Sequence, residues 1–117
     1  MSNRLLRVNA LLQQEISSYL RKRYTSEATR LTISGAEVTG DLREAKVFYT
    51  TISNDPEEIA KAGRFLRSKL GEIRSMVAKN VVMRHVPLLS VHHDASGERA
   101  VRIERLLDSI DQEEKKE

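Results

Sequence analysis

The chain has no cysteine and no tryptophan, and only two of its 117 residues are prolines. The absence of cysteine excludes disulfide bonds, thiolate metal ligands and a cysteine nucleophile. No apolar run approaches the roughly 18 residues that span a bilayer, so we expect no membrane segment. Charges at Arg4, Arg7 and Glu15 interrupt the N-terminal stretch, so we expect no secretory signal and a cytoplasmic protein.

Motifs of the common enzyme classes are also missing. The sequence contains no P-loop, no G-x-S-x-G and no paired-histidine zinc motif. The acids Asp41 and Glu44 are residues of a predicted turn. In a strand, His92 and Asp94 would share a face while His93 points the other way, and two ligands are too few for a first-row metal site. We therefore expect no catalysis, no metal and no cofactor.

The charge is unevenly distributed along the chain. The net charge is +3, but residues 108–117 hold five acids and two lysines, a net −3, which leaves +6 on residues 1–107. A basic body favours an anionic partner, with nucleic acid first. On charge alone, a basic surface that is merely well solvated explains the same numbers equally well.

Apolar periodicity and turn signals predict an alternation of helices and strands. The expected elements are a helix over 3–23, strands over 31–39 and 45–53, a long helix over about 56–81, a strand over 85–94 and a final helix over 99–111. The short link between the first two strands predicts an antiparallel hairpin, and Gly35 indicates a bulge or a close backbone approach in its first strand. Asp55 and Pro56 are suited to the start of the long helix, and Pro87 indicates either a strand start or a strand at the sheet edge.

This order predicts an α+β domain, with helices on one face of a small three-stranded sheet. We expect a single domain over residues 1–111, including the C-terminal helix, and a charged, disordered tail over 112–117. No spare apolar stripe is present, so we expect a monomer, although an edge strand over 85–94 could pair with another chain.

Gly71 is the unusual residue of the long helix, because an interior glycine costs about 1 kcal/mol relative to alanine. On a helical wheel it lies about 120° from Ile59, off the apolar stripe and between Arg67 and Arg64. A bare backbone among guanidinium groups suits a phosphate chain, and a helix break there would add an anion-binding N-terminus. A tolerated surface glycine beside ordinary solvated arginines is the alternative.

The sequence resembles the bacterial ribosome-binding factor A family over roughly residues 4–108. The stretches that carry the resemblance are RVNALLQQEISSYL (7–20), ISGAEVTGDLREAKVFYT (33–50) and IRSMVAKNVVMRHVPLLSV (73–91), of which SGAEVTGDLREAKV is the most specific. The resemblance implies a type II KH-like fold, of the order helix–strand–strand–helix–kink–helix–strand. It also implies binding to free small (30S) ribosomal subunits, a role in their late maturation and in 16S ribosomal RNA processing, and support of growth in the cold.

KH domains clamp nucleic acid with a G-x-x-G loop, but no two glycines here are three positions apart. Members of the family resembled replace this loop with a helix kink at an Ala-x-Gly segment. The corresponding segment here is Lys69-Leu70-Gly71, which keeps the glycine and replaces the alanine with lysine.

Basic residues around this segment are the candidate RNA-binding site. They are Arg64, Arg67, Lys69, Arg74, Lys79 and Arg84, with Gly71 as the kink, and a second cluster of Arg21, Lys22 and Arg23 ends the first helix. The second cluster is equally suited to interact with the helix dipole alone. Only five aromatic residues are present, so recognition of 16S ribosomal RNA should rest on backbone and shape rather than on base stacking.

Two other binding functions remain open at this point. The basic face could serve a non-ribosomal protein–protein adaptor with an acidic partner. A general single-strand KH binder is disfavoured by the missing G-x-x-G loop.

Overall fold

The computed structural model describes residues 3–83 and 85–95 and confirms a mixed α+β fold. Its elements are α1 (Asn3–Arg23), α2 (Thr25–Ala28), β1 (Leu31–Val38), β2 (Glu44–Thr51), α3 (Pro56–Ser68), α4 (Leu70–Asn80) and β3 (Leu88–His93). The four-residue α2 was not predicted from the sequence, in which no helix or strand was expected between residues 23 and 31. The predicted C-terminal helix over 99–111 and the tail over 112–117 lie outside the described residues.

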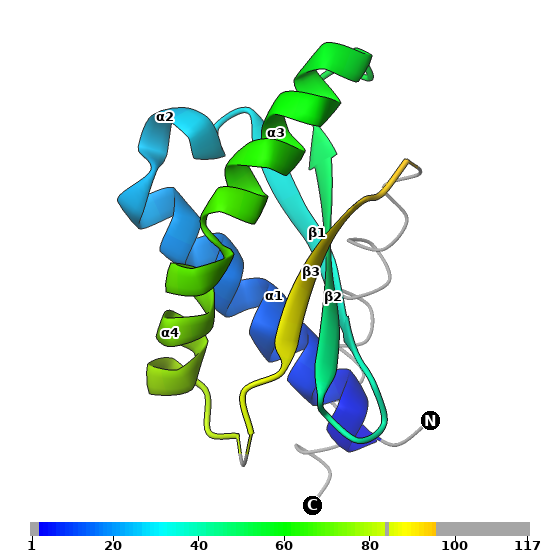
Figure 1. Ribbon diagram of the computed structural model, residues 1–117, viewed down its shortest axis with the longest axis vertical. Helices are drawn as coiled ribbons and strands as arrows, with labels where there is room; N and C mark the ends of the chain where they lie inside the picture. Colours follow the sequence, from blue (N-terminus) through cyan, green and yellow to red (C-terminus); the bar gives the residue numbers. More distant parts are fainter. Residues whose placement is uncertain (1–2, 84, 96–117) are drawn as a thin grey trace, which may run out of the picture.

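The three strands form one sheet in the order β1-β2-β3. The hairpin of β1 and β2 is antiparallel as predicted, and its register shifts between Ile33 and Gly35, which confirms the bulge. Strand β3 runs parallel to β2 and lies at the sheet edge, directly after Pro87. The parallel pairing requires the chain to cross over from β2 to β3, and α3 and α4 form this crossover (Figure 1).

A single core joins the described long helices to one face of the sheet. Helix α1 contributes Leu12, Ile16 and Leu20, which recur every four residues and are all buried. They pack in one cluster with inward-facing strand residues such as Val47, and with Leu66 of α3 and Val77 of α4. In the described part of the chain, no helix has both the length and the apolarity to cross a bilayer.

The start of α3 follows the predicted signals. Asp55 caps the helix by accepting a 3.0 Å hydrogen bond from the Glu57 amide, and Pro56 occupies the first turn. Further along the helix, Gly63 faces the sheet, where a Cβ would lie 2.7 Å from the hydroxyl oxygen of Tyr49. That hydroxyl donates a 2.9 Å hydrogen bond to the Ile59 carbonyl, so Gly63 lets α3 and β2 approach each other closely.

Candidate nucleic-acid interface

The long predicted helix is two helices, and the break lies at Lys69. Its φ of −104° and ψ of 1° are not helical, and it both ends α3 and precedes the first residue of α4. The Lys69 amide donates to the Leu66 carbonyl at 3.0 Å, while its carbonyl accepts from the Ile73 amide at 2.9 Å. The sequence predicted a kink at Gly71, within the segment Lys69-Leu70-Gly71; in the structure the break lies at Lys69, the first residue of that segment.

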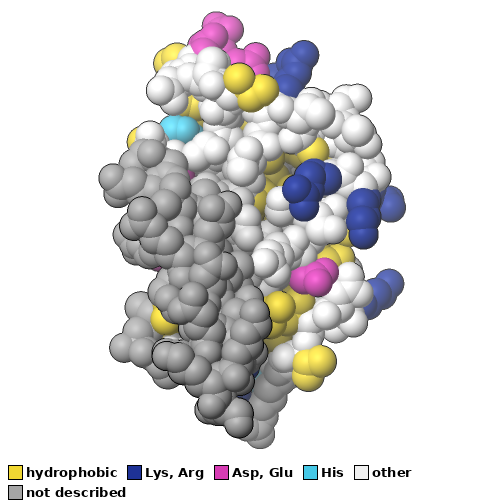
Figure 2. All heavy atoms as spheres, turned by 180° about the vertical axis from the view of Figure 1, so that it is seen from behind, with side chains coloured by type: hydrophobic (Ala, Val, Ile, Leu, Met, Phe, Trp, Pro, Cys, Tyr) yellow, Lys and Arg dark blue, Asp and Glu magenta, His cyan; other side chains and the backbone are white. Residues whose placement is uncertain are grey.

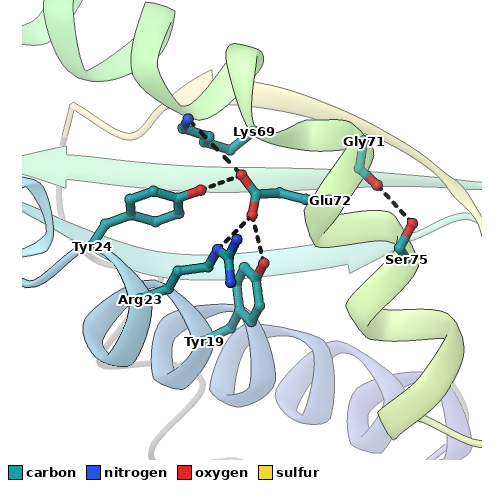
Figure 3. Close-up of polar contacts among 7 residues, drawn as sticks. All are labelled: Tyr19, Arg23, Tyr24, Lys69, Gly71, Glu72 and Ser75. Carbon is teal, nitrogen blue, oxygen red and sulfur yellow. Dashed lines mark hydrogen bonds and ion pairs between the residues drawn. The ribbon is translucent and has the colours of Figure 1, made fainter.

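Gly71 is the second residue of α4 and is exposed. A Cβ at this position would meet no atom within 4 Å, so close packing does not require a glycine there. The residue leaves a patch of bare backbone at the start of α4, next to the Ser75 hydroxyl, which donates to its carbonyl at 3.2 Å (Figure 3). This geometry is compatible with close approach of a partner backbone to α4.

The carboxylate of Glu72 is the centre of a polar network between the end of α1 and the start of α4 (Figure 3). The Tyr19 hydroxyl donates to Glu72 Oε2 at 2.6 Å, and the Tyr24 hydroxyl donates to Oε1. Arg23 Nε lies 3.0 Å from Oε2, and Lys69 Nζ lies 4.0 Å from Oε1. The network fixes the junction between α3 and α4 against α1.

These contacts shift two pKa values in opposite directions. The hydroxyls of Tyr19 and Tyr24, followed by the charges of Arg23 and Lys69, hold the pKa of Glu72 below its usual value. The hydrogen bond to Glu72 raises the pKa of Tyr19. At neutral pH the network therefore contains an ionised glutamate and a neutral tyrosine.

Lys69 also lies against two aromatic rings. Its ammonium group is 4.8 Å from the ring centroid of Tyr24 and 5.9 Å from that of Phe65. The two rings meet edge to face, with centroids 5.3 Å apart. Lys69, which was predicted to bind RNA, is thus held by Glu72 and by this aromatic pair.

Arg74 connects α4 to the loop before β3. Its Nε donates to the Pro87 carbonyl at 3.2 Å, and its Nη2 donates to the Val86 carbonyl at 3.0 Å. Its guanidinium therefore forms hydrogen bonds within the chain. These bonds give Arg74 a structural role that the sequence did not indicate. Arg84, another predicted RNA-binding residue, lies outside the described residues.

The other predicted basic residues are exposed and free of ion pairs within the described part of the chain. They are Arg64 and Arg67 on α3, Lys79 at the end of α4, and Arg21 and Lys22 at the end of α1. The Arg67 guanidinium extends back over Gly63, where a Cβ would lie 2.9 Å from its Nη2. Figure 2 shows the rear face of the molecule, where separate Lys and Arg side chains lie on the right with an acidic side chain among them, and further acidic side chains lie at the upper end.

Two shallow hollows flank α4. One lies between α4 and the end of α1 and is lined by Glu15, Ser18, Tyr19, Lys22, Arg23 and Asn80. The other lies beside Gly71 and is lined by Arg74, Ser75, Ala78, His85 and Val86. The arrangement offers open, partly basic surfaces on both sides of one helix, which suits an extended anionic partner better than an enclosed small molecule.

Polar residues in and directly after β3 contact one another and residues of β1 and β2. The Ser34 hydroxyl donates to Asp94 at 3.1 Å, and both residues are buried. His92 contacts Ser90 at 2.8 Å and the ring of Phe48. Among the described residues, no group of three or more histidine and acidic side chains is placed to hold a metal ion.

Sequence reasoning missed Gly63 and the tyrosine–glutamate network. The only local signal for Glu72 is an acid among arginines, directly after Gly71. Its partners Tyr19 and Tyr24 lie 53 and 48 positions away, so no local pattern could have paired them.

Residues 4–107 match the model of a family described as ribosome-binding factor A. The protein of that name from Opitutus terrae is 44% identical over 113 residues, which cover 97% of this chain and 92% of the relative. The one from Akkermansia muciniphila is 36% identical over 112 residues, which cover 95% and 87%. A crystal structure of ribosome-binding factor A from Thermus thermophilus superposes with a TM-score of 0.66 at 17% identity, covering 76% of this chain and 94% of that one, and supports the fold.

Proposed function

Because the chain belongs to the ribosome-binding factor A family, we propose that it binds free small (30S) ribosomal subunits and assists their late maturation. This role includes support of 16S ribosomal RNA processing and of growth in the cold. The observation that carries the proposal is the family match over residues 4–107, nearly the whole chain. The protein acts as a monomer in the cytoplasm, where subunits are assembled.

The docking surface is the junction of α3 and α4. Arg64 and Arg67 are exposed there without ion-pair partners in the described part of the chain, and Gly71 leaves the backbone of α4 open. Phosphate contacts of this kind supply affinity and register without reading sequence. In this proposal the helix junction takes the place of the G-x-x-G loop in a KH-like domain.

The protein works by occupancy rather than by catalysis. A domain bound to immature 16S ribosomal RNA holds the neighbouring RNA in one arrangement and keeps others from forming early. Release then follows when a competing partner, or a change in the subunit, removes the phosphate contacts.

Sedimentation of a tagged form in a cell lysate tests this function. The gradient separates free small subunits from complete ribosomes, and we expect the protein to migrate with free small subunits and to lose this position after RNase treatment. If it stays with the small proteins at low salt, the ribosomal function is wrong. Migration in a complex that resists RNase would instead indicate an adaptor with an acidic protein partner.

A further inference from the structure

Two of the predicted RNA-binding cations are already paired with an anion inside the molecule. Arg23 and Lys69 both contact the Glu72 carboxylate, one at each oxygen. Each oxygen also accepts a tyrosine hydroxyl, Tyr19 at Oε2 and Tyr24 at Oε1. We call these four donors, Tyr19, Arg23, Tyr24 and Lys69, the anion cradle.

The donor set is suited to a phosphodiester as much as to a carboxylate. A phosphodiester group also carries one negative charge and presents two non-bridging oxygens. Hydrogen bonds from charged donors to such oxygens are the strong ones, and arginine binds carboxylate and phosphate in the same geometry. In the cradle each oxygen of Glu72 meets one tyrosine hydroxyl and one cation, donors that the two non-bridging oxygens of a phosphodiester can also accept from.

The cradle is open to solvent. The side chain of Arg23 is 62% exposed, and those of Lys69 and Glu72 are 30% and 29% exposed. The hollow between α1 and α4 is lined by Tyr19 and Arg23 together with Lys22, so the cradle adjoins a surface with a further exposed cation. The cradle is therefore partly exposed at the protein surface and is not enclosed in the core.

We propose that Glu72 is an internal competitor for RNA: its carboxylate occupies the anion cradle in the free protein, and an RNA phosphate displaces it on binding. This inference rests on the proposed function, and it adds a regulatory step at the same surface. Displacing Glu72 costs part of the binding energy. The tethered carboxylate returns to the cradle as the RNA leaves, so it weakens binding and favours release.

A Glu72→Gln variant tests the competition directly. Glutamine has nearly the same shape and can still accept a tyrosine hydrogen bond, but it carries no charge to hold Arg23 and Lys69. We expect this variant to bind a short oligouridylate roughly fivefold more tightly at moderate salt. Because a phosphate occupies the cradle in both proteins once RNA is bound, we expect the slope of log affinity against log salt to stay nearly unchanged.

Glu44→Gln is the matched control, because it makes the same change in net charge at an exposed position of β2. It should leave the affinity for oligouridylate close to that of the wild type. Adding Arg23→Gln to the Glu72→Gln variant should abolish the gain. If Glu72 only fixed the helix junction, Glu72→Gln would leave the affinity unchanged or lower it, and that outcome would overturn the proposal.

A second measurement uses the wild-type protein and does not depend on how the variant folds. In an NMR titration with oligouridylate, the Nε–H resonance of Arg23 should shift as phosphate replaces Glu72. A resonance that stays unchanged at saturation contradicts the displacement. Failure of the wild type to migrate with small subunits, combined with tighter oligouridylate binding by Glu72→Gln, would overturn the ribosomal function and leave the cradle intact.

Discussion

At the scale of single residues, the two glycines of the crossover have opposite roles. Gly63 is buried against Tyr49 and leaves no room for a methyl group, whereas Gly71 is exposed with open space around it. The sequence drew attention to Gly71 because of its arginine neighbours and offered no reason to single out Gly63. The helical wheel correctly placed Gly71 off the apolar stripe, but the close contact of Gly63 depends on a strand residue that the wheel does not contain.

Substituting each glycine with alanine should separate these roles. Gly63→Ala should lower the free energy of unfolding by about 1–3 kcal/mol, because Tyr49 must shift and weaken its bond to Ile59. Gly71→Ala should raise it by up to about 1 kcal/mol through helix propensity. Urea denaturation measures both values. Equal effects of the two substitutions would contradict the distinction.

Gly71→Ala also tests the open backbone of α4 in binding. If a phosphate chain approaches that backbone closely, the added methyl group should weaken small-subunit binding several-fold while the protein becomes more stable. Filter binding with purified subunits measures this effect. An unchanged affinity for small subunits would indicate that Gly71 is a tolerated surface glycine, which is the alternative that the sequence left open.

The Glu72 network should make the stability of the protein depend on pH in the acidic range. The pKa of Glu72 is lowered in the folded protein, so its contribution is present above the ordinary glutamate value of about 4.3 and is lost as pH falls through the lower folded value. The melting temperature of the wild type should exceed that of Glu72→Gln at neutral pH, and this difference should shrink below about pH 4. A difference that grows as the solution becomes more acidic would refute this role of Glu72.

At the scale of elements, the sequence located most helices and strands through local chemistry. Three of these features depend on contacts between residues close in sequence or on backbone restrictions. They are the cap at Asp55 with Pro56, the bulge at Gly35 and the edge position of β3. The sequence predicted the kink at Gly71, whereas the helix breaks at Lys69. One non-helical residue barely changes the phase of the apolar stripe, so the pattern of apolar residues does not show where the break lies. The four-residue α2 is too short to show any periodicity.

Arg74 was predicted to bind RNA because of its charge, but in the structure it holds α4 to the loop before β3. Arg74→Gln removes charge-assisted bonds to the Val86 and Pro87 carbonyls, and it should lower the free energy of unfolding by about 1 kcal/mol. The loop before β3 should then exchange its amide hydrogens faster. Lys79→Gln is the control, an exposed cation of the same helix without an ion pair in the described region, and should have little effect. Equal stability of both variants would argue against the connection through Arg74.

At the scale of the whole molecule, the sequence predicted the fold class, the family and a basic surface near the helix junction. It could not show which cations are free, because that depends on tertiary contacts. Arg23, Lys69 and Arg74 are occupied within the chain, while Arg64 and Arg67 have no ion pair in the described residues. In the free protein the proposed docking surface therefore centres on Arg64 and Arg67, and Arg23 and Lys69 become available to RNA only when Glu72 is displaced.

Binding of purified small subunits by an Arg64→Glu, Arg67→Glu double variant tests this surface most directly. Its control is Arg4→Glu, Arg43→Glu, which makes the same change in net charge on α1 and in the hairpin turn, away from the helix junction. With melting temperatures that match the wild type, we predict that the first variant loses co-sedimentation with small subunits and that the control retains it. Retained binding by the Arg64, Arg67 variant, or equal loss by both, would contradict docking through the junction of α3 and α4.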